Sequence, residues 1–334
     1  MNPLNHSKIQ DIIGSQSDYK LYATDDTLVS NTDAIGVEIE LEGISHYSPG
    51  SALPNIFYNW RAVEDGSLRN GTEFIFKEPF KAKNITASLE IMNQFLAAYR
   101  AVTGTGVIVN ERCSVHVHLD VRELDGQELN NLILVYLLFE KVLFEYISPT
   151  RSKNNYCRPL ADSSFKATLH NLLTIKSDNL TYDLIRIISR DCDKYSALNV
   201  LPVQNFGSVE FRHMPGTDDT TKIFDWINVI LALKVAARSF SVQELLAVFK
   251  EKDCLSLLMM VFQGTKLPSK VLLSDYETLL SRGVSDVVEI LEWDNLYKIT
   301  QKYRHTKRKT GTESTLLERY NLQKSKELDL ELGA

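Results

Sequence analysis

Polar and apolar residues alternate strictly along three short segments of the chain. Strict alternation is typical of a β-strand with one face in the core, because successive side chains point to opposite faces of a sheet. A fourth stretch, residues 59–80, predicts further strands joined by turns at Asp65-Gly66 and Asn70-Gly71, since both dipeptides favour tight hairpins. The three alternating segments are IGVEIELEG (35–43), CSVHVHLDV (113–121) and GSVEFRHM (207–214).

Helical periodicity dominates the remainder of the patterned sequence. Apolar residues at three- and four-residue steps predict a helix over 85–99 behind the cap Asn84, an apolar helix over about 127–147, and a helix of about twenty residues starting near Thr220. Beyond Phe240 every pattern is helical, and two residue pairs have capping-box spacing. These pairs are Ser241 with Glu244 and Ser274 with Glu277.

This order of elements predicts an α+β fold, a mostly antiparallel sheet with helices on one side and a helical C-terminal region. Three parts follow from it. Residues 1–33 are polar and weakly patterned, which indicates an N-terminal arm. Residues 34–240 form the α+β domain, and residues 241–334 form a helical extension that either packs on this domain or mediates self-association.

Charge and cysteine content narrow the class of protein. The chain has 37 Lys and Arg against 43 Asp and Glu, a net charge of −6, which argues against a nucleic-acid partner. The basic run 302–309 (KYRHTKRK) could contact nucleic acid or an acidic partner, but such a run is more often a solvated helix face or linker. No apolar stretch is long enough for a signal peptide or a membrane span, and four widely spaced cysteines favour a reducing, cytoplasmic compartment.

The alternation also gathers acidic and basic side chains on single strand faces. Residues two apart on a strand lie about 7 Å from each other on one side of the sheet. In the first strand this places Glu38, Glu40 and Glu42 together. In the second it places His116 and His118 with Ser114 and Asp120, while Cys113 points to the other face, which weakens a zinc site. The third strand adds Glu210 and Arg212, and GTEFIFK adds Glu73.

If these strands share one sheet, its polar face is crowded with carboxylates that cannot all stay ionised unless cations neutralise them. Hard oxygen ligands favour Mg²⁺ or Mn²⁺, and Arg212 suits a phosphate that such a metal would bring. Each signal alone has a simpler explanation: a solvated sheet face, packed histidines, or an exposed ion pair. Their joint occurrence on successive strands favours the metal site.

As an ordered set, these segments resemble the amidoligases common in phage and bacterial genomes. That family is a distant relative of glutamine synthetase and glutamate-cysteine ligase, and the resemblance covers about residues 34–240. The segments are GVEIE, WRAVEDGS, GTEFIFKEPF, HVHLD, RSKNNYCRPL, KYSALNV and VEFRHMPGT.

The resemblance implies a glutamine synthetase-like catalytic fold and an ATP- and Mg²⁺-dependent ligase. In that reaction ATP phosphorylates a carboxylate, and an amine displaces the phosphate to form an amide. By motif, the metal ligands fall on Glu38, Glu40, Glu73, His116 and Glu210; His118 reaches the nucleotide phosphates, and Arg212 stabilises the transferring phosphoryl group. We count Glu40, His118 and Arg212 as the catalytic residues. The family often has glycine where this chain has Ser114.

Several readings stay open at this point. Arg151 and Arg158 flank a loop where family ligases bind phosphate or a substrate carboxylate, yet both could be solvated arginines. Asp65 could orient substrate, although its place in a hairpin turn explains it as well, and Asn199 suits a buried polar bridge. The acid and the amine could be small molecules, peptides or protein side chains. A phosphotransferase or phosphohydrolase, or a non-catalytic binding or structural protein, would keep the same fold.

Overall fold

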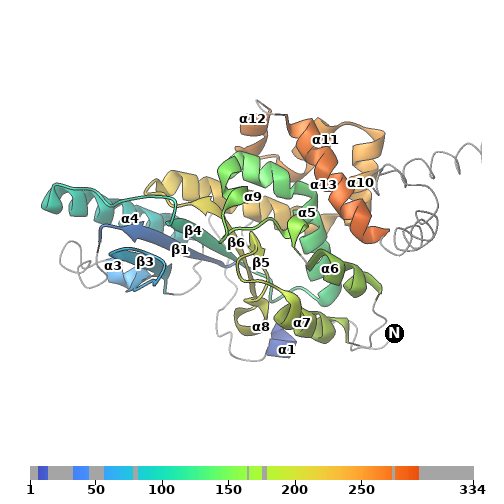
Figure 1. Cartoon of the computed structure of the whole chain (residues 1–334), viewed down its shortest axis with the longest axis horizontal. Coiled ribbons are helices and arrows are strands. Elements are labelled where there is room, and N and C mark those ends of the chain that lie inside the picture. Colours follow the sequence, from blue (N-terminus) through green and yellow to red (C-terminus); the bar gives the residue numbers. More distant parts are fainter. Residues whose placement is uncertain are drawn as a thin grey trace, which may run out of the picture.

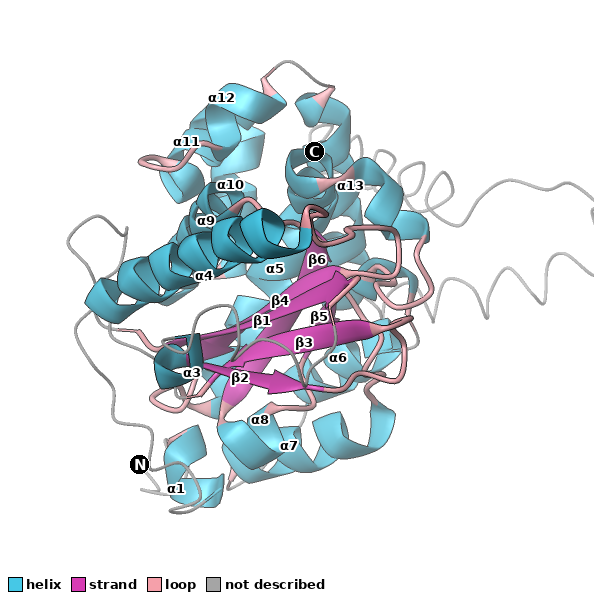
Figure 2. Ribbon diagram, turned by 90° about the vertical axis from the view of Figure 1, so that its left-hand side faces the viewer, coloured by secondary structure: helices cyan, strands magenta, loops and turns pink. Residues whose placement is uncertain are grey.

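The computed structural model describes residues 7–13, 33–44, 56–77, 82–163, 165–174, 179–272 and 275–292. A six-stranded sheet in the order β2-β3-β1-β4-β6-β5 crosses its centre (Figures 1 and 2). Neighbouring strands are antiparallel throughout, so the predicted α+β class with an antiparallel sheet is confirmed. The strands are β1 (Ile35–Glu42), β2 (Trp60–Val63), β3 (Gly71–Phe76), β4 (Ser114–Asp120), β5 (Leu198–Asn199) and β6 (Ser208–Pro215).

The segment predicted as strands with two tight turns forms a single hairpin. β2 pairs with β3, and one loop over residues 64–70 contains both turn dipeptides. Asn70 has a positive φ of 51°, a conformation that asparagine tolerates better than most residues. The loop is therefore wider than two tight turns, and Asp65 lies two residues after the end of β2.

Twelve α-helices of the described residues surround the sheet or extend from it. The predicted helices over 127–147 and from Thr220 are confirmed as α5 and α9. The helix predicted over 85–99 runs instead over Ala82–Thr103, so it begins three residues earlier, and the prediction of Asn84 as its cap is wrong because residue 84 lies inside the helix. The helices are α1 (Ile9–Ile13), α3 (Ile56–Asn59), α4 (Ala82–Thr103), α5 (Gly126–Ile147), α6 (Phe165–Thr174), α7 (Leu180–Asp191), α8 (Val203–Phe206), α9 (Thr220–Ser239), α10 (Val242–Glu251), α11 (Cys254–Phe262), α12 (Leu267–Val271) and α13 (Tyr276–Leu291).

Helix caps explain where several of these helices begin. The capping box of Ser241 with Glu244 is present at α10. At α13 the cap is Asp275, whose carboxylate accepts a hydrogen bond from the backbone N–H of Thr278. The predicted pairing of Ser274 with Glu277 is therefore wrong for the cap, and Ser274 itself lies outside the described residues. A carboxylate one residue later performs the same task.

The apolar faces of the strands form the core together with α5 and α9. Ile35, Val37, Ile39 and Leu41 of β1 are at most 1% exposed. Figure 2 shows α5 behind the sheet, and helix α5 contacts both β6 and α9. Within the described part of the chain, α5 and α9 therefore pack on the apolar face of the sheet and do not cover its polar face, as the alternation predicts.

The described part of the C-terminal region packs on α5. Phe139 of α5 meets Phe262 of α11 edge-on at 5.1 Å between ring centroids. Gly283 of α13 lies so close to α5 that an added Cβ would come within 2.0 Å of the Leu138 carbonyl oxygen. Figure 1 shows α10 to α13 grouped at one end of the molecule. The basic run 302–309 lies outside the described residues, and none of the described helices is long and apolar enough to cross a membrane.

Candidate active site

Strand register brings the predicted site residues together on one face of the sheet. Glu40 of β1 lies opposite Glu73 of β3, and Glu38 lies opposite His116 of β4. His118 in turn lies opposite Glu210 of β6. Because directly paired residues have side chains on the same face, the predicted metal ligands form one continuous cluster. We call Glu38, Glu40, Glu73, His116, His118 and Glu210 the acidic cluster.

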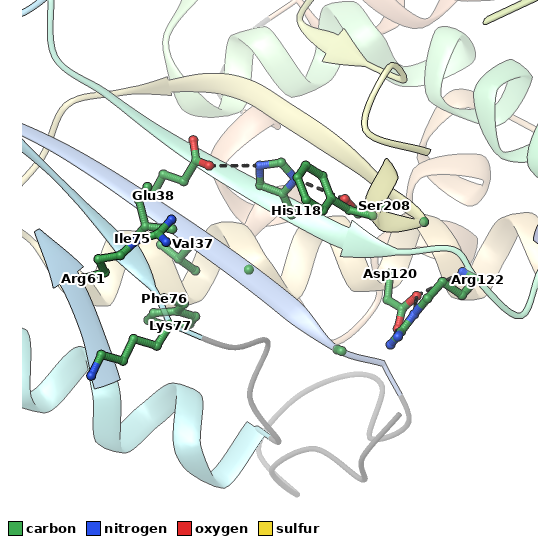
Figure 3. A pocket seen from close by; sticks show the side chains of 14 residues that line it. Val37, Glu38, Arg61, Ile75, Phe76, Lys77, His118, Asp120, Arg122 and Ser208 are labelled. Carbon is green, nitrogen blue, oxygen red and sulfur yellow. Dashed lines mark hydrogen bonds and ion pairs between the residues drawn. The ribbon is translucent and has the colours of Figure 1, made fainter. Parts of the chain in front are cut away.

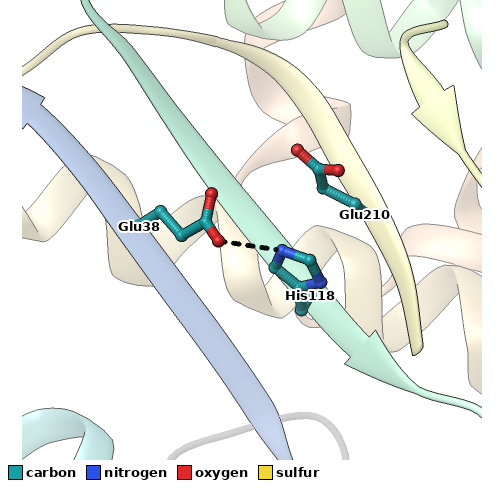
Figure 4. Close-up of side chains that lie close together, drawn as sticks. All are labelled: Glu38, His118 and Glu210. Carbon is teal, nitrogen blue, oxygen red and sulfur yellow. Dashed lines mark ion pairs between the residues drawn. The ribbon is translucent and has the colours of Figure 1, made fainter. Parts of the chain in front are cut away.

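His116 lies at the centre of the acidic cluster. Its Nδ1 is 3.1 Å from Glu38 Oε2 and 3.3 Å from Glu210 Oε1, and its Nε2 is 3.9 Å from Glu40 Oε1. His118 Nε2 is 3.3 Å from Glu38 Oε1, and its Nδ1 is 3.2 Å from Ser208 Oγ. Figure 4 shows Glu38 and His118 pointing toward each other from adjacent strands, with Glu210 next to them on β6.

Arg212 and Asn199 flank Glu210. Arg212 Nη1 forms an ion pair with Glu210 Oε1, and its Nε donates a hydrogen bond of 3.1 Å to the Tyr156 carbonyl oxygen. Asn199 Nδ2 donates to Glu210 Oε2 at 2.6 Å. Asn199 is thus the buried polar bridge that the sequence predicts, and it also fixes the orientation of a site carboxylate. The pairing of β4 with β6 is irregular between Val115 and Val117, beside Arg212.

The carboxylates of the cluster oppose one another's ionisation. Burial, followed by the charges of Glu38, Glu40 and Asp65, raises the pKa of Glu73 to about 8. Burial also raises the pKa of Glu40. Burial opposes the ionisation of Glu38 too, but its hydrogen bonds and charge pairing with the two histidines together lower the pKa of that carboxyl. Without a cation, one member of the cluster therefore carries a proton at neutral pH.

The donor set fits divalent cations bound through oxygen. Three overlapping groups have ligand atoms within 4.8 Å of one another: Glu38 with His118 and Glu210, Glu38 with Glu73 and His116, and Glu40 with Asp65 and Glu73. His116 Nε2 is buried and has no hydrogen-bond partner among the described residues. An orphaned buried nitrogen beside excess carboxylates is what a metal would complete.

Asp65 is the main addition to the predicted ligand set. The sequence explains it as a turn residue, and its carboxylate does accept a hydrogen bond of 2.6 Å from the Ser67 backbone N–H. The hairpin loop nonetheless folds over the sheet so that Asp65 joins Glu40 and Glu73. The path of a seven-residue loop cannot be predicted from the local sequence pattern. In the sequence, only the acidic side chain of Asp65 indicated that it could belong to the site.

Two clefts open on either side of Glu38. The narrow cleft, about 230 Å³ in volume, runs from Glu38 and His118 past apolar walls that include Phe76 and Phe206, with Arg61 and Lys77 among its lining residues (Figure 3). Asp120 and Arg122, which are ion-paired at 2.6 Å, also line it. The narrow cleft thus combines apolar surface with cationic side chains and ends at Glu38 and His118 of the acidic cluster.

The wide cleft, about 410 Å³ in volume, lies over the other half of the acidic cluster. The acidic members Glu38, Glu40 and Glu73 form one part of its lining, and Arg151, Lys194 and Arg212 form another. Tyr156 and Tyr195, whose rings meet edge-on at 5.3 Å, also line it. An acidic surface and a cationic surface therefore face one space.

The structure separates the two arginines that the sequence could not rank. Arg151 is 5% exposed, and its Nη2 donates to Ser114 Oγ at 3.1 Å and to the Arg212 carbonyl oxygen at 3.0 Å. Its Nε has no hydrogen-bond partner within the described part of the chain. Arg158 instead forms an ion pair with Asp193, with about half its side chain exposed, and it is not among the residues lining either cleft. Ser114, the departure from the family's glycine, thus holds Arg151.

Glu42 and Cys113 do not join the cluster. The Glu42 carboxylate accepts hydrogen bonds from the Arg69 backbone N–H at 2.7 Å and from Asn110 Nδ2 at 2.6 Å, so it ties loops at the end of β1. Cys113 is buried, and its Sγ faces the carbonyl oxygen of Ile108 at 3.7 Å. The expectation that Cys113 points away from the histidines agrees with this contact.

Comparison with known families matches part of the chain. Residues 85–234 match the model of a family described as "putative amidoligase enzyme". The match confirms the resemblance to the amidoligases and covers the strands that carry His116, His118, Glu210 and Arg212. Glu38, Glu40 and Glu73 precede the matched residues. Their strands β1 and β3 belong to the same sheet as the matched strands β4 and β6. No curated protein matches the chain.

Proposed function

With residues 85–234 assigned to the amidoligase family, we propose that the protein is an ATP- and Mg²⁺-dependent carboxylate–amine ligase with a glutamine synthetase-like catalytic fold. The observation that supports this most is the acidic cluster between two clefts of different character. One cleft offers apolar walls and cations, and the other offers a cationic wall that includes a buried arginine. Such a pair suits a nucleotide and an acid whose reacting ends meet at the cluster.

The acidic cluster would hold the divalent ions. Glu38, Glu40, Glu73, His116 and Glu210 are the proposed ligands, with Asp65 added by the geometry. Bound Mg²⁺ or Mn²⁺ would neutralise phosphate charge and stabilise the charge that develops during phosphoryl transfer. The fit rests on the orphaned Nε2 of His116 and on the raised pKa of Glu73, because both are conditions that a cation relieves.

The nucleotide is assigned to the narrow cleft. Ile75 and Phe206 offer apolar surface to a base, and His118 lies where this cleft meets the cluster. His118 can donate to a phosphate oxygen, since Glu38 and Glu210 together raise the pKa of the imidazole despite its burial. Charge-assisted hydrogen bonds of this kind orient phosphate groups more strongly than neutral ones.

The acid is assigned to the wide cleft. Arg151 is the preferred partner for a carboxylate, because it is buried there and its Nε–H finds no acceptor among the residues that the structure describes. Attack of the bound carboxylate on the γ-phosphorus would release ADP and leave an acyl phosphate. Arg212, at the edge of the cluster, is placed to stabilise the transferring group.

Amide formation completes the reaction in the same cleft. The amine attacks the acyl carbon, phosphate leaves, and the amine loses a proton to a carboxylate. Glu111 also lines the wide cleft and is not among the proposed metal ligands, so its carboxylate can accept that proton. Holding all three reactants in one place contributes to the rate by removing the entropy cost of their encounter.

A trapping experiment tests this proposal. The protein is incubated with ATP, Mg²⁺, a panel of carboxylic acids and hydroxylamine, and ADP and hydroxamate are measured. Acid-dependent ADP release with matching hydroxamate supports a ligase, and Glu210→Gln should abolish both signals. ADP release without hydroxamate, whatever the acid, identifies a phosphohydrolase or phosphotransferase. ATP binding without ADP release identifies a non-catalytic protein.

A further inference from the structure

A buried carboxylate on α5 connects the helical layer to the loop that forms part of the wide cleft. Glu140 has no exposed surface. Its Oε1 accepts hydrogen bonds from the Leu160 backbone N–H at 2.5 Å and from Tyr136 Oη at 2.6 Å, and its Oε2 accepts from the Ala161 backbone N–H at 3.0 Å. All three donors face the carboxylate from within the core, where an unmade hydrogen bond is costly.

The same network reaches the strand that carries Glu210 and Arg212. Tyr136 Oη lies 2.9 Å from Nε2 of His213 on β6, which is also completely buried. Because the hydroxyl proton is donated to Glu140, the imidazole Nε2–H must donate to the hydroxyl oxygen. One chain of hydrogen bonds thus runs from β6 through Tyr136 to Glu140. His213 is the immediate neighbour of Arg212.

The loop held by Glu140 is the one that supplies Arg151 and Tyr156 to the wide cleft. Leu160 and Ala161 lie in a short 3₁₀ helix near the end of this loop, and Arg151 lies in another near its start. Between them, Arg158 exchanges backbone hydrogen bonds with Tyr195 and Ala197 at 2.8 and 2.7 Å. Ala197 in turn accepts from the Arg212 backbone N–H at 2.9 Å. Arg151 and Arg212, two of the cationic side chains that line the cleft, therefore share one backbone framework.

We propose that Glu140 is a positioning residue that sets the location of Arg151 relative to Arg212, through the loop on one side and through Tyr136 and His213 on the other. The proposal rests on the assignment of the wide cleft to the acid. Glu140 touches no substrate. It acts by fixing the backbone that presents Arg151, whose Nη2 also donates to the Arg212 carbonyl oxygen.

Glu140→Gln tests the loop half of the network while keeping side-chain volume. Glutamine has one acceptor oxygen, and its NH₂ must face either the Ala161 N–H or the pair formed by Leu160 N–H and Tyr136 O–H. We expect the backbone amide left without an acceptor to exchange its hydrogen at least tenfold faster. We also expect the KM for the acid that supports ADP release to rise at least tenfold. Mn²⁺ and ATP affinities, measured by calorimetry, should stay within twofold, because the acidic cluster is untouched.

Two further variants separate positioning from general loss of stability. Phe139→Leu removes the contact with Phe262 on the other side of the same helix, so it weakens α5 packing without touching the loop. This variant should leave the amide hydrogen-exchange rates of Leu160 and Ala161, and the KM for the acid, within twofold of the wild-type values. Tyr136→Phe cuts the link to His213 but keeps both backbone amides on Glu140. It should leave the exchange of Leu160 and Ala161 near the wild-type rate.

The outcomes are distinct from those of the functional proposal. Unchanged exchange at both Leu160 and Ala161 in Glu140→Gln, or an equal rise in acid KM in Phe139→Leu, overturns the positioning role. If exchange increases but no acid supports ADP release by the wild-type protein, the ligase assignment fails and the acid-positioning role fails with it. If exchange and acid KM both change as expected, each proposal is supported by its own measurement.

Discussion

Two regions of the molecule bury several charged groups, and they do so in opposite ways. In the acidic cluster, Glu40 and Glu210 are each 5% exposed among further carboxylates. At the end of β4, Lys234 of α9 is 1% exposed and forms ion pairs with Asp33 and Glu123, and it donates to the Asp120 carbonyl oxygen at 2.6 Å. We call these residues the Lys234 network.

The difference between these two regions is the balance of charge. In the Lys234 network the cation is paired with the surrounding anions, so the charges attract one another. The pair with Lys234 also anchors Asp33, two residues before β1, to helix α9. In the acidic cluster like charges predominate, and the pKa of Glu73 is raised to about 8 as a result. A buried set of like charges is stabilised only when a ligand supplies the opposite charge, which is why it marks a functional site.

Removing a charge should therefore have opposite consequences in the two regions, and the largest effect on activity is expected for Glu210→Gln. Glu210 contacts His116, Asn199 and Arg212, so its loss affects the metal site and the phosphoryl-binding arginine together. We expect ADP release to fall at least about 1,000-fold, equivalent to about 4 kcal/mol in the activation barrier. The rate of ADP release under saturating ATP and Mg²⁺ measures it.

The control for this variant is the stability of the metal-free protein. Glu40→Gln should also lose activity, yet its free energy of unfolding should equal or exceed that of the wild type, because one repelling charge is gone. A large loss of stability in both Glu210→Gln and Glu40→Gln would show that these carboxylates stabilise the fold and do not serve to bind a ligand.

Lys234→Met should have the reverse profile. Methionine keeps most of the side-chain volume but removes the ammonium group that pairs with the carboxylates of Asp33 and Glu123. Breaking a buried ion pair from one side typically costs about 3–5 kcal/mol. We expect a loss of this size in urea unfolding, with ADP release per folded molecule close to the wild-type value. An unchanged free energy of unfolding would show that the ion pairs of Lys234 do not stabilise the fold.

Arg212→Lys should reduce activity less than Glu210→Gln but more than Lys234→Met. Lysine keeps the positive charge beside Glu210 but loses the planar fork that can bind two phosphate oxygens. We expect kcat to fall about 10- to 100-fold, while the Kd for ATP with Mg²⁺ changes less than threefold. Steady-state kinetics and calorimetry separate the two quantities. An equal change in both would assign Arg212 to nucleotide binding rather than to the transfer step.

The sequence was sufficient for features that depend on local periodicity. Alternation alone put Glu38 and Glu40, His116 and His118, and Glu210 on single strand faces, because side-chain direction on a strand is fixed by the backbone. The long helices follow from a period of 3.6 in the same way. Those patterns are local, so they need no knowledge of the strand order.

Features that depend on long-range geometry were missed or left undecided. Arg151 and Arg158 are seven residues apart in one loop, and only the folded chain shows that the first is buried in the cleft and the second is paired with Asp193. Asp65 had a complete local explanation as a turn residue. His213 showed no partner in sequence, because Tyr136 belongs to a helix 77 residues earlier. A local pattern cannot report contacts that form only when distant segments pack.

The smallest expected effect concerns the pH dependence of stability at Glu73. The pKa of this carboxyl is about 8 in the folded protein against an ordinary value of 4.5, so between these pH values the folded state holds a proton that the unfolded state has lost. The free energy of unfolding of the metal-free protein therefore falls as pH rises through that window. Glu73→Gln removes this titration, because glutamine has no proton to lose.

The advantage of Glu73→Gln over the wild type should accordingly be small near pH 5 and largest above pH 8. Glu73 is only partly buried, and solvent screening reduces the effect to about 1–2 kcal/mol. Urea unfolding at pH 5 and pH 8.5 in the presence of a chelator measures the difference. Saturating Mg²⁺ should reverse its sign, since the wild type then gains binding energy that the variant lacks. A difference independent of both pH and Mg²⁺ would remove Glu73 from the proposed metal site.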